Sequence, residues 1–429
     1  MTLKFRASQV FENISLWIVL FSLSGIGLWP HAVTGEIQGK EFINSALSYI
    51  ATTISLIYIL YSFKYLITNR IPTGAKALLI FIIYIIIGAI WSEEPLSSII
   101  SSTRLVTYTI FTMIQIRRNS EFFRSVILYC ALFAFLNLAA VVLAPSHATE
   151  QGWLSRAGDW RGLLVYRIAL GATSAGLLLA VLHDSFTRHP RLNRWIALGT
   201  ICALAALVYG SQARLAWASL IIGAPLLVLM HAVQRMPARH RVSWGALGLI
   251  GAVLIPVSLS SALPVVAEAW GRDLTFSGRS QLWPLFIQRA MLEPVTGHGT
   301  GVFFSDPVGR EVLWREARWA GFSTAHNSYI EWFLNLGVPG LILFSVVMAI
   351  YYVKVCSAAL LSDLEYAPLL VALCPVITTQ TLFMSEAAFP SPTWIIITLT
   401  LAAPMTRRLH RRPTRPLPKL RPCTAAPVS

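Results

Sequence analysis

Arginine, histidine and glycine residues gather in one long polar interval between two apolar runs. The interval contains Ser277-Gly278-Arg279-Ser280, then Gly297-His298-Gly299-Thr300-Gly301, then Ala325-His326-Asn327, and it closes with Gly337-Val338-Pro339-Gly340. A guanidinium beside the first backbone N–H groups of a helix suits a phosphate group. An imidazole in a polar setting can accept a proton, or donate a hydrogen bond to a sugar hydroxyl or a phosphate. These residue types therefore favour phosphate binding beside a reacting hydroxyl.

Two short helices are predicted to position these side chains. Residues 282–292 place apolar side chains on most faces of a helix, with Pro284 near its first turn, where proline is tolerated. We expect this helix at the membrane interface or against the bundle. Residues 327–336 predict a second helix that stops at Gly337, with Pro339 beyond it as the start of the next span. His326 is therefore expected at a helix N-terminus.

The composition indicates that the bilayer is the solvent for most of the chain. Of its 429 residues 55% are hydrophobic and only 12% charged, and the mean hydropathy is +0.64, whereas soluble proteins carry about 25% charged residues. The first apolar run has no small-residue cleavage site after it, which predicts a retained span. We predict an all-α polytopic membrane protein with about 12 transmembrane helices and a large periplasmic loop containing short helices. The expected spans are 14–31, 43–63, 77–92, 98–116, 122–144, 168–183, 195–210, 213–232, 244–262, 339–355, 366–384 and 391–405.

The distribution of positive charge predicts the orientation of these spans. Alternate loops and the two termini carry 22 of the 34 Lys and Arg residues, which places both termini in the cytoplasm. The long loops 145–167 and 263–338 then face the outside, which in a bacterial inner membrane is the periplasm. Because the net charge of +15 sits on juxtamembrane loops, topology and anionic lipid head groups explain it. No nucleic-acid partner is expected.

The chain is expected to divide into four parts. Residues 1–262 form the membrane bundle with the first nine spans, 263–338 the periplasmic loop with the site, and 339–405 the last three spans. Residues 406–429 are predicted to be a disordered, basic, Pro-rich cytoplasmic tail. No internal repeat is found, which counts against transporters built from two related halves. The five cysteines fall within spans or on the cytoplasmic side, and no Cys/His cluster has metal spacing, so neither disulfides nor a metal site is expected.

Four further charged residues are candidates. Arg214 follows the tight turn 209–213, and a cation in the first turn of a helix opposes the helix dipole unless an anion bridges the two. Arg104 lies inside the fourth expected span, where a charge is a functional candidate by default. Arg161 adds a cation on the outer side, and Glu386 could pair with one of the arginines. Simpler roles remain open: interfacial anchoring for the arginines, and helix capping or solvation for His326.

These stretches resemble the O-antigen ligase and O-antigen polymerase superfamily of bacterial inner-membrane glycosyltransferases. The resemblance is carried by 277–301, by Ala325-His326-Asn327-Ser328-Tyr329 with 337–341, and by Ser211-Gln212-Ala213-Arg214. Trp91-Ser92 with Pro95 and Trp160-Arg161-Gly162-Leu163 also resemble family patterns. The match covers roughly residues 85–345. The chain departs from the pattern at 165–168, where a His-Lys-Asn stretch is usual, and at His298, where an aromatic is common.

The resemblance implies transfer of a sugar chain from undecaprenyl diphosphate to an acceptor hydroxyl in the periplasm, without a metal or cofactor. It implies that Arg214 and Arg279 bind the diphosphate, and that His326 orients or deprotonates the acceptor hydroxyl. We therefore expect His326, Arg279 and Arg214 to be catalytic. Residues expected to contribute to substrate binding are Arg161, Asn327, Gly278, Gly299, Glu386 and Arg104.

Three functions remain open at this point. Polymerisation of lipid-linked repeat units into exopolysaccharide or O-antigen is favoured over ligation of a finished chain onto lipid A-core. A polysaccharide or lipid transporter is the alternative from another class, although transporters usually place charges near the midplane. The expected partners are the undecaprenyl-diphosphate-linked donor, a glycan acceptor, membrane lipids and a chain-length regulator.

Overall fold

The structure is a computed structural model that describes most of the chain. The described residues are 2–23, 38–64, 71–150, 158–164, 166–237, 240–246, 279–304, 324–361, 364–385 and 391–403. The predicted tail 406–429, the two site residues Gly278 and Glu386, and most of the ninth expected span, 244–262, lie outside them.

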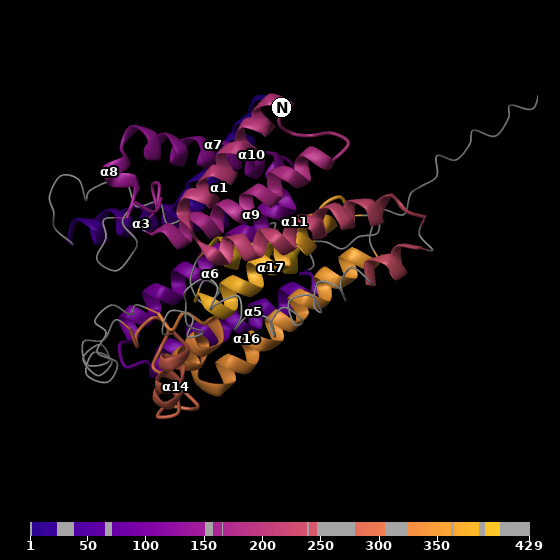
Figure 1. The fold of residues 1–429 in the computed structure, drawn as a ribbon. Helices are drawn as coiled ribbons and strands as arrows, with labels where there is room; N and C mark the ends of the chain where they lie inside the picture. The colour runs from indigo at the N-terminus through magenta and orange to yellow at the C-terminus, as the bar shows by residue number, and fades with distance from the viewer. Residues whose placement is uncertain are drawn as a thin grey trace, which may run out of the picture.

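Helices make up nearly all of the described backbone, in agreement with the predicted all-α fold (Figure 1). An isolated bridge between Thr149 and Trp160 is the β-type pairing found among the described residues. The helices are α1 (Thr2–Leu23), α3 (Gln38–Tyr61), α5 (Thr73–Gly88), η1 (Ala89–Trp91), α6 (Pro95–Arg118), α7 (Phe122–Leu143), α8 (Pro145–Ala148), α9 (Arg167–Phe186), α10 (Arg194–Ser211), α11 (Arg214–Arg235), α14 (Arg279–Ala290), α16 (Ser328–Leu361), α17 (Ala367–Phe383) and α18 (Pro392–Ala402).

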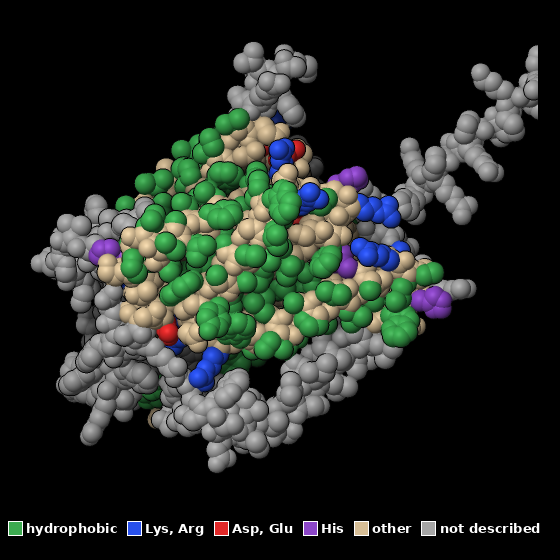
Figure 2. All heavy atoms as spheres, turned by 45° about the horizontal axis from the view of Figure 1, so that its top comes forward, with side chains coloured by type: hydrophobic (Ala, Val, Ile, Leu, Met, Phe, Trp, Pro, Cys, Tyr) green, Lys and Arg blue, Asp and Glu red, His purple; other side chains and the backbone are tan. Residues whose placement is uncertain are grey.

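The described helices are those of a multi-pass membrane protein. Six segments are long and apolar enough to cross a membrane: α5 with η1, α7, α9, α10, α11 and α16. The apolar parts of α1, α3, α17 and α18 are shorter. Each expected span other than 244–262 overlaps a described helix. Six of them fall on the long apolar segments, and 14–31, 43–63, 98–116, 366–384 and 391–405 overlap α1, α3, α6, α17 and α18. Figure 2 shows a face covered largely by hydrophobic side chains, with most of its Lys and Arg gathered along one side, as expected for a surface that meets lipid.

Three buried clusters hold the bundle together. The largest joins α5, α11, α16, α17 and α18, and Trp332 is fully buried in it, with its ring centroid 4.8 Å from that of Phe81. A second cluster joins α7, α9 and α10, and a third joins α1, α3 and α6. Trp394 of α18 also donates a 2.7 Å hydrogen bond to Thr109 of α6, so its indole N–H is satisfied inside the bundle.

Helix α16 is interrupted at Gly337, as the sequence predicts. Gly337 has φ 67° and ψ −166°, a backbone conformation that is essentially restricted to glycine. A Cβ atom built on it would lie 2.6 Å from the carbonyl oxygen of Pro294. Residues 328–336 are therefore a separate half-helix, and the long apolar part of α16 follows the kink.

A backbone strap, residues 294–299, satisfies the broken end of the half-helix. The N–H groups of His298 and Gly299 donate to the carbonyl oxygens of Leu334 and Asn335, each at 2.9 Å. In the other direction the N–H of Val338 donates to Pro294 at 2.7 Å. Carbonyl groups at a helix end lack partners within the helix, and the strap supplies them.

Helix α14 begins a turn earlier than predicted. The expected helix was 282–292, whereas α14 is Arg279–Ala290, so Pro284 lies in its second turn and not its first. The expectation that it packs against the bundle is correct: Leu282 and Phe286 join a buried cluster with Phe333 and Leu334 of the half-helix. Arg279 is thus the first residue of α14, although its side chain is outside the described residues.

We predict that Gly337→Ala destabilises the protein by about 1–3 kcal/mol, because an L-residue is strained at this φ and ψ and its Cβ meets the strap. The stability is measured by heating the protein in detergent and monitoring the loss of the folded peak by size-exclusion chromatography. Gly199→Ala in α10 is the matched control, since its Cβ would lie 3.5 Å from Phe135, an ordinary contact. That control should be neutral or stabilising by up to about 1 kcal/mol. Equal stability of the two variants would contradict this account of the kink.

Candidate functional site

The backbone around His326 is held in a left-handed conformation by three parts of the fold. His326 has φ 52°, which is uncommon for a residue other than glycine. The preceding amide, Ala325 N–H, donates to Oε2 of Glu331 at 2.7 Å, and the following amide, Asn327 N–H, donates to Oγ of Ser385 at 3.2 Å. Nε1 of Trp283 on α14 donates to the Ala325 carbonyl at 3.2 Å. The peptide groups on both sides of His326 are therefore fixed.

Glu331 is the centre of this bracket, and it is not among the residues predicted from the sequence. Its side chain is fully buried, and its Oε2 also accepts a 2.9 Å hydrogen bond from Ser385. Its Oε1 is buried without a hydrogen-bond partner among the described residues. A carboxylate is costly to bury, and its two donors offset part of that cost. The sequence does carry a signal for this residue: Glu331 is the single acidic residue in the apolar run Tyr329-Ile330-Glu331-Trp332-Phe333.

The side chains beside His326 complete the local structure. Oδ1 of Asn327 accepts from the N–H groups of Tyr329 at 2.9 Å and Ile330 at 3.2 Å, so Asn327 is the N-cap of α16. His326 therefore lies at a helix N-terminus, as predicted. Its Nδ1 is 3.4 Å from Oγ1 of Thr324. A role of Asn327 in substrate binding stays a prediction, because its amide oxygen is used for capping.

Arg214 is the first residue of α11, directly after a tight turn. Gln212 in that turn has φ 50°, and the turn is fixed to the start of α9 by Arg167, whose Nη1 donates to the carbonyl oxygen of Gln212 at 3.1 Å. Arg167 also forms an ion pair with Asp159 at 3.2 Å. Arg167 falls in the stretch that departs from the family pattern, and sequence reasoning did not single it out.

Arg161 uses its guanidinium to hold a loop. Its Nε and Nη2 donate to the carbonyl oxygen of His147 at 3.0 and 2.8 Å, and its backbone N–H donates to Ala148 at 2.8 Å. The neighbouring Trp160 N–H donates to the carbonyl of Gly210 at 2.8 Å, which ties this loop to the α10–α11 turn. The predicted role of Arg161 in binding substrate remains a prediction.

Gly299 and His298 form the part of the strap that contacts the start of α6. Gly299 has φ 103°, and a Cβ on it would overlap Oγ of Ser92, so a side chain cannot fit. Nδ1 of His298 is 2.7 Å from Oε1 of Glu93, and the His298 carbonyl accepts from Ser92 at 3.2 Å. The strap is thereby fixed to the segment that carries Trp91-Ser92.

Arg104 belongs to a different part of the bundle. Its guanidinium carbon lies 4.6 Å from the ring centroid of Tyr49 on α3, a cation–π geometry. Its Nε is buried and has no hydrogen-bond partner among the described residues. Arg104 is therefore placed against α3, and the described contacts do not join it to the His326 bracket.

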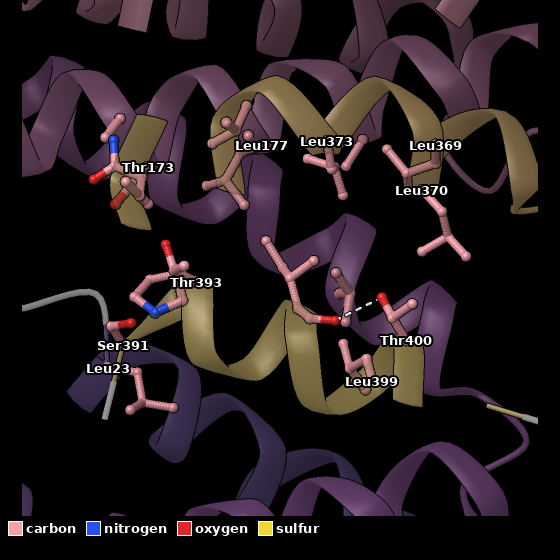
Figure 3. A pocket seen from close by; sticks show the side chains of 18 of the residues that line it. Leu23, Thr173, Leu177, Leu369, Leu370, Leu373, Ser391, Thr393, Leu399 and Thr400 are labelled. Atoms are coloured by element: carbon pink, nitrogen blue, oxygen red, sulfur yellow. Dashed lines mark hydrogen bonds between the residues drawn. The ribbon is translucent and has the colours of Figure 1, made fainter. Parts of the chain in front are cut away.

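A crevice of about 790 Å³ extends from His326 along the bundle. One end is lined by Thr324, His326, Gln380 and Ser385, and the other by Asp184, Arg191 and Glu365. Figure 3 shows the middle, where Leu369 and Leu373 of α17 face Thr393 and Leu399 of α18 across a gap, with Thr173 and Leu177 of α9 beside them. His326 is thus positioned at one mouth of a largely apolar passage.

Comparison with known proteins supports the family resemblance. Residues 198–345 match the family model described as O-antigen ligase. This region contains Arg214, Arg279 and His326. The chain is also 28% identical over 156 residues to "Exopolysaccharide production protein ExoQ" of Rhizobium meliloti (strain 1021). The aligned part spans 35% of this chain and 35% of that relative. These matches cover part of the chain, and over that part they support the resemblance to O-antigen ligases and polymerases. The described helices are those of a multi-pass membrane protein.

We predict that Glu331→Ala releases the His326 loop. Each buried N–H or O–H group left without its acceptor costs about 1–3 kcal/mol, so amide hydrogen exchange in the peptide covering 324–330 should accelerate. Glu331→Gln keeps an acceptor oxygen and should show an intermediate effect. Exchange in the strap, residues 294–299, serves as the internal reference and should change less. Unchanged protection of the Ala325 and Asn327 amides in Glu331→Ala would disprove the bracket.

Proposed function

We propose that this protein is a glycosyltransferase of the bacterial inner membrane that joins lipid-linked oligosaccharide repeat units at the periplasmic face. The observation that carries the proposal is the bracket that fixes His326 at a helix N-terminus, at the mouth of the crevice. The family match over 198–345 and the relative named for exopolysaccharide production support it. The donor would be a glycan on undecaprenyl diphosphate, and the acceptor a second lipid-linked glycan.

His326 would handle the acceptor. In the proposed step, the acceptor hydroxyl oxygen attacks the anomeric carbon of the donor sugar, and the bond from that carbon to the diphosphate oxygen breaks. The hydroxyl proton passes to Nε2 of His326, which requires the tautomer whose Nδ1 carries hydrogen toward Thr324, 3.4 Å away. If His326 orients the hydroxyl without taking its proton, the same position serves that role.

Arg214 and Arg279 would stabilise the leaving diphosphate. Both are the first residues of helices, where backbone N–H groups point outward and favour an anion. Charge accumulates on the diphosphate as the glycosidic bond breaks, so cations and N–H groups held beside it would lower the barrier. Neither step in this proposal requires a metal or a cofactor.

A polymerase differs from the two alternative functions, a ligase and a transporter, in the acceptor or the path that it requires. A ligase would use the same donor and transfer a finished chain to lipid A-core. A transporter would need hydrogen-bonding groups along a path for the glycan, whereas the middle of the crevice is lined mainly by Leu, Ile, Val and Ala side chains. That lining favours the enzyme. Control of chain length by a partner protein is expected with the polymerase.

We predict that His326→Ala, Arg279→Ala and Arg214→Ala each abolish polymer formation while the protein remains folded and inserted. Loss of a general base or positioned donor slows chain growth by about 10²–10⁴-fold. Polymer length and yield from cells lacking the chromosomal copy are the measurements. Arg124→Ala is the matched control, because Arg124 is exposed and pairs with Glu121 on the same helix end at 3.4 Å. Polymer of normal length and yield from the His326→Ala and Arg279→Ala variants would contradict the assignment of these two residues to the site.

Purified protein with lipid-linked repeat units separates the three functions. Chain growth without ATP or metal supports the polymerase, and transfer only when lipid A-core is added supports the ligase. Movement of the lipid-linked glycan across the bilayer without chain growth would instead indicate a transporter.

A further inference from the structure

Two arginines of α6 each lie over a tyrosine ring of α3. The guanidinium carbon of Arg118 is 4.6 Å from the ring centroid of Tyr61. That of Arg104 is 4.6 Å from the ring centroid of Tyr49. The two arginines are 14 positions apart, about 21 Å along the helix, against a hydrocarbon core of about 30 Å. Arg118 ends α6 on the side predicted to be cytoplasmic, so Arg104 lies toward the predicted outer side.

Arg118 has a counter-ion from its own chain. Its Nε pairs with Oε1 of Glu12 on α1 at 3.1 Å, and its Nη1 donates to Oγ of Ser62 at 2.7 Å. The Glu12 side chain is itself buried. A charge at a helix end is here balanced within the fold, as expected for an arginine with a structural role.

Arg104 has the same aromatic contact without a counter-ion. In the part of the chain that the structure describes, no ion pair or hydrogen bond to its guanidinium is found, and its Nε is buried without a partner. A cation–π contact contributes about 0.5–2 kcal/mol, whereas an arginine at the centre of a span costs about 2.5–3.5 kcal/mol. The ring of Tyr49 alone does not balance the charge, and an anion from outside the chain would.

The depth of Arg104 suits a lipid phosphate of the outer leaflet. Earlier on α6, Oγ of Ser98 accepts from the N–H of Thr300 at 3.1 Å. A Cβ on Gly301 would lie 3.0 Å from Oγ of Ser101, three residues before Arg104. Polar backbone of the loop predicted to face the periplasm therefore reaches within about one turn of Arg104. Because helical side chains point toward the N-terminus of their helix, the guanidinium is directed to that polar boundary.

This position is open to lipid and separate from the crevice. The side chain of Tyr49 is 52% exposed, and Ile99 and Ile100 on α6 are 51% and 38% exposed. Exposed apolar side chains on a membrane helix face the bilayer. Neither Arg104 nor Tyr49 lines the crevice at His326. An anionic lipid therefore has access to Arg104 from the membrane.

We propose that Arg104, over the ring of Tyr49, binds the diphosphate of the acceptor lipid. The identity of this ligand rests on the proposed function. In that reaction the attacking hydroxyl belongs to a sugar, and the acceptor diphosphate is at the lipid end of the same glycan. The glycan separates these two groups, so the acceptor diphosphate must be held apart from His326 and from the like charge of the donor. A guanidinium suits this task, since it binds phosphate oxygens through two parallel N–H donors.

The first test counts bound lipid diphosphates by native mass spectrometry of the full-length protein released from detergent. The probe is undecaprenyl diphosphate without sugar. We expect two molecules on each unmodified chain and one on Arg104→Ala and Arg104→Gln, where the remaining molecule shows that the protein is folded. Arg124→Ala, which removes an exposed arginine, is the matched control and should bind two. A single molecule on the unmodified chain, or two on Arg104→Ala, would overturn the proposal.

A phospholipid is the competing source of the same phosphate chemistry. With phosphatidylglycerol in roughly tenfold excess, the Arg104-dependent molecule should remain bound, because a diphosphate offers a guanidinium more charge and more acceptor oxygens than a phosphodiester. Its displacement by phosphatidylglycerol would make Arg104 an interfacial anchor and refute the acceptor site.

The second test compares two acceptors with one donor: the repeat-unit glycan on undecaprenyl diphosphate, and the same glycan on a neutral alkyl chain. Arg104→Ala should lower the ratio of the first transfer rate to the second roughly tenfold, a change of about 1.4 kcal/mol. An unchanged ratio would indicate a purely structural role and contradict the proposal. If the unmodified protein extends neither acceptor, the glycosyltransferase function fails, while the count of bound diphosphates still decides whether Arg104 binds one.

Discussion

The break in α16 at Gly337 is the constraint on which the rest of the site depends. A helix that stops within a membrane protein leaves carbonyl and N–H groups that must find partners, because lipid offers none. The strap supplies them through His298, Gly299 and Pro294. With its end satisfied, the half-helix 328–336 is a separate element before the long span, and Asn327 caps its N-terminus. Both α14 and the end of α17 can then bond to the loop that contains His326.

Local sequence signals predicted the elements that carry the site, because each signal acts within a few residues. Gly337 with Pro339 predicted the kink in α16, and the turn before Arg214 predicted the start of α11. The predicted start of α14 is one turn late. Pro284 suits the first turn of a helix, but the helix extends back to Arg279. The resemblance contributed the reaction class, which no spacing or periodicity in the chain could supply.

Contacts between distant parts of the chain were beyond that reasoning. Glu331 meets Ser385, and Trp283 meets Ala325, through pairings that only the fold creates. Arg161 is a candidate for substrate binding by its residue type, and in the fold its Nε and Nη2 donate to the His147 carbonyl. An arginine donates equally well to a phosphate and to a backbone carbonyl. Its residue type therefore does not reveal which of the two it meets.

Under the proposed function, selectivity comes from the polar end of the crevice, because lipid and the apolar middle of the crevice distinguish little between apolar groups. At that polar end the His326 imidazole would act on hydroxyl and charged groups of the substrate. A rigid backbone matters there, because a reacting bond misplaced by about 1 Å costs on the order of 10²-fold in rate. The buried carboxylate of Glu331 therefore fixes the position of the backbone around His326. It accepts from the Ala325 amide before His326, and through Ser385 it holds the Asn327 amide after it.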